Sequence, residues 1–107
     1  MSTPTIPSRT QPARVVFITG AARGIGRAIA AIYRDAGWNV IAPTRAELEL
    51  GSLASVQAWL RQNTPKVDVL INNAGENKVA EIERLEVEDW QRQMTVNLTS
   101  PMLLMQA

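Results

Sequence analysis

VVFITGAARGIG, residues Val15–Gly26, is a short apolar run that leads directly into three closely spaced glycines. The run is mostly β-branched or aromatic, which predicts a strand buried on both faces. The glycines predict a tight turn, and a helix follows. This order places backbone N–H groups and a helix N-terminus against a phosphate. Gly20 can take a backbone conformation closed to other residues, whereas Gly24 and Gly26 lack the Cβ atoms that would keep a pyrophosphate or the neighbouring strand at a distance.

The glycine spacing GxxxGxG narrows the choice of ligand. A P-loop requires GxxxxGK followed by Ser or Thr, and no lysine follows Gly24 or Gly26. This argues against a nucleoside triphosphatase. The spacing also differs from the GxGxxG dinucleotide fingerprint. A glycine-rich turn without a ligand therefore remains an alternative for these residues taken alone.

The composition is that of an ordinary globular domain. The chain has 107 residues, is 46% hydrophobic and 20% charged, and carries a formal net charge of +1 without a basic run, which argues against nucleic-acid binding. It has no cysteine and no histidine, which excludes disulfides, thiol chemistry and the common zinc sites. There is no apolar run of the roughly 20 residues that span a bilayer, and the N-terminus lacks the apolar core of a secretory signal. We expect a cytoplasmic protein that binds no membrane and no metal.

Residues 14–107 are expected to form one domain after a flexible, proline-rich leader at residues 1–13. A strand at Arg14–Thr19, a helix ending near Ala36 and a strand at Trp38–Ala42 make a βαβ unit. The helix carries an apolar stripe of Ile25, Ile29, Ile32, Tyr33 and Ala36.

The segment at residues 44–51 leaves two interpretations open. Alternating Glu and Leu at residues 47–50 suit a short strand, but too few residues precede it for a helical crossover. Either the segment is extended at the margin of the sheet, or the usual helix has been deleted.

The second half repeats the alternation of helix and strand. Ser52 is a good N-cap for a helix to about Asn63, and Val67–Ile71 predicts a buried strand. Residues 76–86 predict a polar loop with one weak helical turn. A last helix begins near residues 87–89 and runs to the end of the chain, with an apolar stripe of Trp90, Met94, Asn97, Leu98, Pro101, Leu104 and Met105.

Three motifs stand in one order: the glycine turn with Thr19 before it, Asn72-Asn73-Ala74-Gly75, and Trp90 followed by Asn97. This order resembles the short-chain dehydrogenase/reductase family over about residues 14–107. The resemblance implies an α/β fold with a Rossmann-type parallel sheet and flanking helices, incomplete at about the first four strands. It also implies NAD or NADP across the carboxyl ends of the strands.

The resemblance assigns the candidate cofactor residues. The turn from Gly20 to Ile25 would hold the pyrophosphate, and Glu49 and Leu50 would meet the adenine ring. Asn73 and Ala74 would line the adenosine ribose, and Asn72 would tie neighbouring strands together. The expected cofactor-binding set is Gly20, Ala21, Ala22, Arg23, Gly24, Ile25, Gly26, Thr44, Arg45, Glu49, Leu50, Asn73, Ala74 and Gly75.

The charges beside the second strand favour NADP over NAD. A carboxylate at the end of that strand would bind the ribose hydroxyls of NAD and repel a 2′-phosphate. Uncharged Thr44 stands there instead, with Arg45 and Arg23 nearby. Guanidinium groups suit a phosphate, because they can donate two parallel hydrogen bonds. The alternative is that both arginines are ordinary surface charges.

Asn97 is the candidate catalytic residue. It is polar on an apolar stripe, which costs free energy unless its groups are bonded. Pro101 has no N–H, so the carbonyl of Asn97 lacks its usual helical donor. In the family that is resembled, the matching Asn holds a water in the proton path. An Asn that only bonds a neighbouring strand is the alternative.

Other catalytic residues of that family are missing from this sequence. The sole tyrosine, Tyr33, has Gly37 four residues later, so Tyr-x-x-x-Lys is absent. The resemblance therefore implies the N-terminal part of an NAD(P)-dependent oxidoreductase that transfers hydride between nicotinamide and a carbonyl or alcohol substrate. This part would lack the catalytic Ser and Tyr-x-x-x-Lys of the family and would be inactive by itself. The intact protein would be a homo-oligomer. The alternatives are a non-catalytic NADP-binding module and a structural piece that binds nothing.

Overall fold

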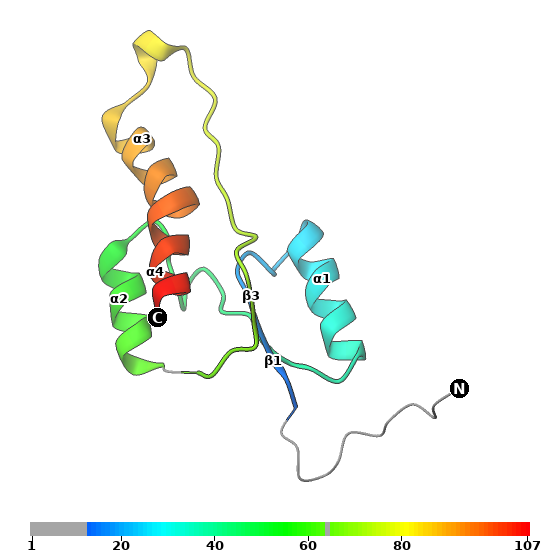
Figure 1. Cartoon of the computed structure of the whole chain (residues 1–107). Helices are drawn as coiled ribbons and strands as arrows, with labels where there is room; N and C mark the ends of the chain where they lie inside the picture. Colours follow the sequence, from blue (N-terminus) through cyan, green and yellow to red (C-terminus); the bar gives the residue numbers. More distant parts are fainter. Residues whose placement is uncertain (1–12, 64) are drawn as a thin grey trace.

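The computed structural model describes residues 13–63 and 65–107 as a parallel sheet with helices on both faces (Figure 1). Strands β1 (Val15–Ile18), β2 (Asn39–Ile41) and β3 (Val69–Ile71) lie in the order β2-β1-β3. Both pairings with β1 are parallel. The predicted α/β fold is confirmed, with three strands in the described part instead of about four. The leader lies outside the described residues except for Ala13.

Strand β1 is buried on both faces, as predicted, and its alternation creates two cores. Phe17 faces α2 (Leu53–Gln62) and α4 (Ser100–Gln106), where it packs with Val56 and Leu104. Val16 and Ile18 face α1 (Gly24–Asp35) and pack against its Ala30. The central strand thus holds both helical layers to the sheet.

The predicted apolar stripe of α1 is wrong in part. Ile25 and Ile32 are 74% and 67% exposed, whereas Gly26 and Ala30 are buried. A Cβ at Gly26 would collide with the carbonyl of Gly20, so the helix lies too close to the end of β1 for larger side chains. Close approach, rather than hydrophobicity, selects the buried face. Tyr33 is a core aromatic, as expected, and packs edge-on against Trp38 with the ring centroids 4.9 Å apart.

The segment after β2 forms a helical turn, so a short strand at residues 47–50 is the wrong interpretation. The backbone N–H of Thr44 donates to Glu47 Oε1 at 2.9 Å, and the N–H of Glu47 donates to Thr44 Oγ1 at 3.2 Å. This reciprocal pair is a capping box. The N–H of Leu48 then donates to the carbonyl of Thr44 at 2.9 Å, and Leu48 is buried in the core.

Helix α2 begins as predicted, because the Ser52 side chain accepts from the N–H of Ser55 at 3.2 Å. The polar loop contains one helical turn, η1 (Ile82–Arg84). The last helix is divided into α3 (Val87–Met94), a π-helical segment η2 (Thr95–Thr99) and α4.

The predicted stripe of the last helix is also wrong in part. Val96, Ser100 and Leu104 are buried, whereas Leu98 and Met105 are 59% and 65% exposed. The π segment causes the shift: the N–H of Ser100 donates to the carbonyl of Thr95, five residues back, which adds a residue to that turn. The Ser100 hydroxyl then donates to the carbonyl of Leu50 at 2.6 Å and fixes the buried face.

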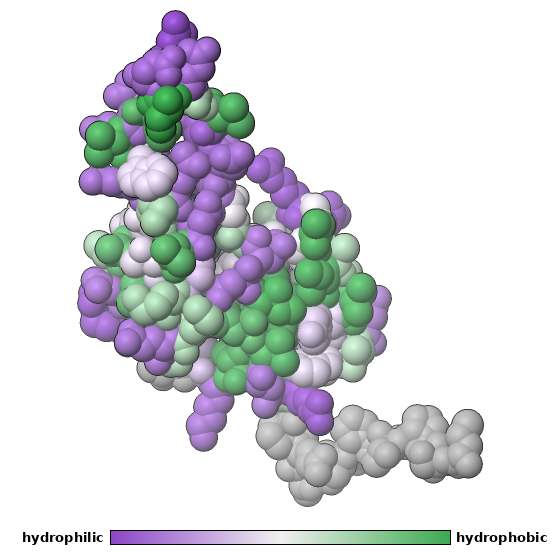
Figure 2. All heavy atoms as spheres, turned by 45° about the horizontal axis from the view of Figure 1, so that its top comes forward, coloured by the Kyte–Doolittle hydropathy of each residue, from purple (hydrophilic) through white to green (hydrophobic). Residues whose placement is uncertain are grey.

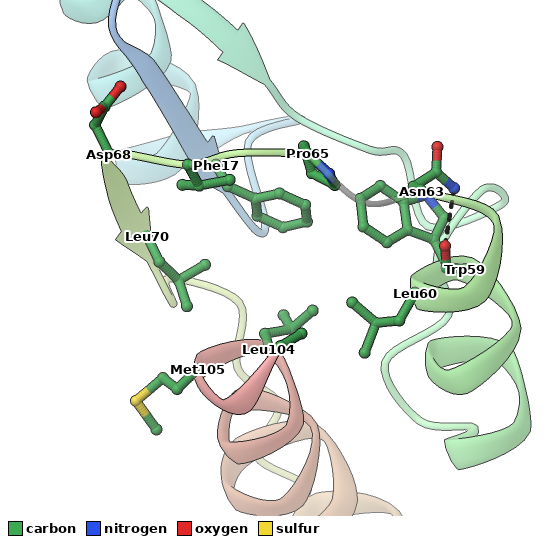
Figure 3. Close-up of a pocket in the computed structure, with 11 residues that line it drawn as sticks. Phe17, Trp59, Leu60, Asn63, Pro65, Asp68, Leu70, Leu104 and Met105 are labelled. Atoms are coloured by element: carbon green, nitrogen blue, oxygen red, sulfur yellow. Dashed lines mark hydrogen bonds between the residues drawn. The ribbon is translucent and has the colours of Figure 1, made fainter.

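One side of the sheet is incompletely covered. β3 pairs with β1, and the described part of the chain places no strand on its other edge. Figure 2 shows an apolar area between α1 and α4, where Figure 1 places β3. Behind this edge, Phe17, Leu70 and Leu104 point toward one another around an apolar hollow of about 390 Å³ (Figure 3).

We expect the chain to self-associate when expressed alone, because open strand edges pair with one another. Gel filtration with light scattering should give a mass above that of the monomer. A lysine at the exposed Val67, just before β3, should lower this mass, because lysine discourages edge pairing. Ala31→Lys, on the exposed face of α1, is the control. A wild-type monomer that unfolds cooperatively would contradict the expectation.

Candidate cofactor cleft

A cleft of about 730 Å³ lies at the carboxyl ends of the three strands. The turn after β1, the turn after β2 and the loop after β3 form its walls. Every predicted cofactor residue lines it except Gly26. The lining also includes five residues outside the predicted cofactor-binding set, namely Thr19, Pro43, Leu48, Glu76 and Val96.

The glycine turn opens the cleft toward α1. Gly20 and Gly24 have φ values of 68° and 61°, the left-handed region that favours glycine. A Cβ at Gly20 would lie 2.9 Å from the Cα of Ala74, so this glycine lets two loops touch. A Cβ at Gly24 would meet nothing within 4 Å. Gly24 therefore leaves open space beside the start of the helix, whereas the lack of a Cβ at Gly26 lets α1 pack closely against the end of β1.

The N-terminus of α1 suits an anion. Its N-cap residue, Arg23, makes no side-chain capping hydrogen bond, and the first turn contains no acidic residue. The first N–H groups of a helix lack intrahelical acceptors and carry partial positive charge. With the open space at Gly24, these residues fit a phosphate group.

The ends of β1 and β3 are tied by a small hydrogen-bond cluster. The hydroxyl oxygen of Thr19, which is buried, accepts from the N–H groups of Asn73 at 3.1 Å and Ala74 at 3.0 Å. The Asn73 side chain donates to the carbonyl of Gly20 at 3.1 Å. Asn73 therefore makes the tie that was predicted for Asn72, which is exposed.

Four charged side chains meet at the rim of the cleft. Arg92, from α3, donates to Glu76 at 2.7 and 2.8 Å and to Glu49 at 2.9 Å. Arg45 Nε donates to the other oxygen of Glu49 at 2.9 Å. We call this set, Arg45, Glu49, Glu76 and Arg92, the rim network.

The rim network holds its two carboxyl groups ionised. Burial raises the pKa of Glu49, but hydrogen bonds from Arg45, the Gly51 N–H and Arg92 outweigh this and lower the pKa to about 2. The Arg92 hydrogen bonds lower the pKa of Glu76. Sequence reasoning missed Arg92 and Glu76, because they approach Glu49 only in the folded chain.

Asn97 lies in the π segment, and both the nitrogen and the oxygen of its side chain are hydrogen-bonded. Its amide donates to the carbonyl of Glu76 at 2.7 Å, and its oxygen accepts from the Glu76 N–H at 2.8 Å. Asn97 does not line the cleft; it holds the loop after β3. Its catalytic role stays a prediction.

The amino-acid sequence is similar to those of known dehydrogenases and reductases. Residues 49–107, more than half of the chain, match the family model described as short chain dehydrogenase. The chain belongs to this family. It is 32% identical over 108 residues to the 3-oxoacyl-(acyl-carrier-protein) reductase FabG of Vibrio cholerae, covering 81% of the chain and 44% of the relative. It is 30% identical over 118 residues to the D-threitol dehydrogenase of Mycolicibacterium smegmatis, covering 88% and 45%.

Solved structures of the short-chain dehydrogenase family share the architecture. One is an oxidoreductase from Brucella ovis in complex with a partially ordered NAD, with a TM-score of 0.71 and 25% identity, over 89% of this chain and 56% of that one. Another, from Streptomyces avermitilis, has a TM-score of 0.76 and 25% identity, over 91% and 43%. The chain thus spans less than half the length of the two relatives named above.

The described residues contain neither a cluster of metal ligands nor a membrane-spanning helix. Among residues 13–63 and 65–107, no group of three or more acidic side chains could hold a metal ion. No helix in that same part of this family member is long and apolar enough to cross a membrane.

The cluster at Thr19 gives a matched pair of variants. Asn73→Ala should lower the free energy of unfolding by about 1 kcal/mol, because it removes a hydrogen bond between the ends of two strands. Asn72→Ala, one residue away and exposed, should change it by less than about 0.5 kcal/mol. Urea unfolding followed by circular dichroism measures both. Equal effects would mean that Asn73 does not tie the strands.

The low pKa of Glu49 predicts a loss of stability in acid. The folded pKa of about 2 lies below the ordinary value of 4.5, so the stabilisation is complete above pH 4.5 and disappears as the pH falls toward 2. The melting temperature of Glu49→Gln should therefore fall less steeply over this range than that of the wild type. Glu83→Gln, on the exposed turn η1, should follow the wild type. Identical slopes for all three proteins would contradict the assignment.

Proposed function

We propose that this chain forms the NADP-binding part of a short-chain dehydrogenase-type oxidoreductase. The observation that carries the proposal is the position of left-handed Gly20 and Gly24 beside the uncapped N-terminus of α1, on a cleft at the carboxyl ends of the strands. A dinucleotide pyrophosphate is the anion that such a turn accommodates in a parallel α/β sheet.

The cleft residues divide into two groups under this proposal. The turn from Gly20 to Ile25 would hold the pyrophosphate through its backbone N–H groups. Asn73, Ala74 and Gly75 would line the adenosine ribose, with Glu49 and Leu50 near the adenine. When bound, the nicotinamide cofactor would supply hydride transfer to or from a carbonyl or alcohol substrate. The backbone carbonyl of Asn97 would hold a water molecule in the path of the proton that is transferred to or from the substrate.

The preference for NADP rests on the end of β2. Residues 42–44, Ala-Pro-Thr, contain no carboxylate that would repel a 2′-phosphate. The next residue, Arg45, lines the cleft and has a side chain that is 72% exposed. Arg23, from the turn after β1, lines the cleft as well. A phosphate dianion gains charge-assisted hydrogen bonds from guanidinium groups.

We propose further that the 107-residue chain binds the cofactor without turning over substrate. Its sole tyrosine, Tyr33 of α1, packs against Trp38 and does not line the cleft. Tyr-x-x-x-Lys does not occur in this sequence. The Brucella ovis neighbour, solved with NAD, supports a nicotinamide cofactor but does not distinguish NAD from NADP.

The test is a titration of the purified chain with NADPH and with NADH, followed by nucleotide fluorescence. Both should bind, NADPH more tightly. Thr44→Asp should shift the ratio of the two affinities toward NADH about tenfold, because the new carboxylate repels the 2′-phosphate and accepts hydrogen bonds from ribose hydroxyls. Thr44→Asn, nearly the same shape without the charge, is the control.

Two results would overturn these proposals separately. No binding of either nucleotide would refute the cofactor site. Binding of both, with a ratio that Thr44→Asp leaves unchanged, would refute only the basis of NADP preference.

A further inference from the structure

We propose that Arg92 is a positioning residue for NADP selectivity: it neutralises Glu49 and Glu76, which would otherwise repel a 2′-phosphate at Arg45. This inference rests on the proposed cofactor site and adds a residue that does not line the cleft.

Arg92 is held between the two carboxylates. Its Nε and a terminal nitrogen donate to both oxygens of Glu76, and the same terminal nitrogen donates to Glu49. The three side chains are each about one-third exposed. The fold makes room for this guanidinium, because a Cβ at Gly51 would collide with it. The bidentate contact and the space at Gly51 indicate a defined seat rather than a passing surface pair.

Arg45 depends on the same carboxylates. Its Nε donates to Glu49 at 2.9 Å, and a terminal nitrogen lies 3.7 Å from Glu76. The Arg45 side chain is 72% exposed, so a phosphate could reach its guanidinium. Glu49 therefore orients Arg45 while also placing negative charge beside it.

The charge balance makes Arg92 important. With Arg92, two guanidinium groups face two carboxylates, and the rim network is neutral. Without it, Arg45 alone would face both carboxylates, and the net charge at the rim would be −1. Even with the dielectric constant of bulk water, a unit charge about 7 Å from a phosphate dianion changes the affinity of the dianion by roughly tenfold. The ribose hydroxyls of NAD are uncharged, so NADH affinity should change little.

A purely structural role for Arg92 makes a different prediction. Arg92 also joins α3 to the turn before α2 through Glu49, so its loss could loosen the whole cleft. Loosening would weaken NADPH and NADH together. The ratio of their affinities separates the two roles, since it responds to charge at the 2′ position and not to general disorder.

The experiment measures the affinities of NADPH and NADH for four proteins: the wild type, Arg92→Met, Glu76→Gln and the double variant. Arg92→Met should lower the ratio of NADPH to NADH affinity about tenfold, and Glu76→Gln should raise it. The double variant restores neutrality, with Arg45 facing Glu49 alone, so its ratio should return toward the wild-type value. Adenosine 2′,5′-bisphosphate and adenosine 5′-monophosphate, which lack the nicotinamide, should show the same pattern.

A remote variant and high salt test whether the change in the affinity ratio comes from charge at the rim. Arg61→Met removes the same charge from the last turn of α2 and should leave the ratio unchanged. The differences should shrink in 1 M salt, where charges are screened within about 3 Å. If Arg92→Met does not fold, as judged by circular dichroism, Glu76→Gln and Arg92→Lys carry the test. Glu76→Gln should still raise the ratio, and Arg92→Lys, which keeps the charge, should preserve it.

Three outcomes would overturn the inference. If both nucleotides bind and neither Glu76→Gln nor Arg92→Met changes the ratio, the rim charges do not set selectivity. If Arg92→Met weakens both nucleotides equally and Glu76→Gln does not rescue it, Arg92 is only a structural clamp. If the wild type binds neither nucleotide, the proposed cofactor site itself fails, and this inference fails with it.

Discussion

The close approach of Gly20 to both α1 and the end of β3 is the constraint on which the rest of the structure depends. The carbonyl of Gly20 accepts from Asn73 and would collide with any Cβ at Gly26. One carbonyl thus sets the distance from the sheet to the helix and from the first strand to the third. The same approach turns the N-terminus of α1 toward the carboxyl ends of the strands, where the cleft lies.

Patterns within a few neighbouring residues correctly predicted the elements that depend on short-range interactions. The apolar run at residues 15–18 became the central strand, and Ser52 became the N-cap of α2. The strand expected at residues 47–50 failed because two patterns competed there. Alternating Glu and Leu suited a strand, whereas Thr44 and Glu47, three residues apart, are the signature of a capping box. The two hydrogen bonds of the capping box form within four residues. A further parallel strand would first need a helical connection, and the chain has too few residues for one at this point.

Features set by tertiary contact could not be predicted in this way. Hydrophobic periodicity predicted that Ile25 and Ile32 lie on the buried face of α1. Both are exposed, because the sheet lies too close to the helix for side chains of this size. The π segment moved the buried face of the last helix, and the sequence marks it only by Pro101. Arg92 reaches Glu49 across 43 residues of chain, so no spacing rule would pair them. The candidate site was therefore predicted where it depends on backbone turns, and missed where it depends on charges brought together by folding.

Binding and turnover are physically separable in this architecture. The cleft is formed by the carboxyl ends of three parallel strands with their following loops, the N-terminus of α1 and Val96 of η2, and all of these lie within a chain that spans less than half of the two relatives named above. Under the proposed function, proton transfer would require further groups, since Tyr-x-x-x-Lys does not occur in this sequence. The catalytic role of Asn97 stays a prediction: its side chain holds the loop at Glu76, and Pro101 lacks the N–H that would bond the backbone carbonyl of Asn97 in a regular helix, so this carbonyl is the group predicted to hold a water.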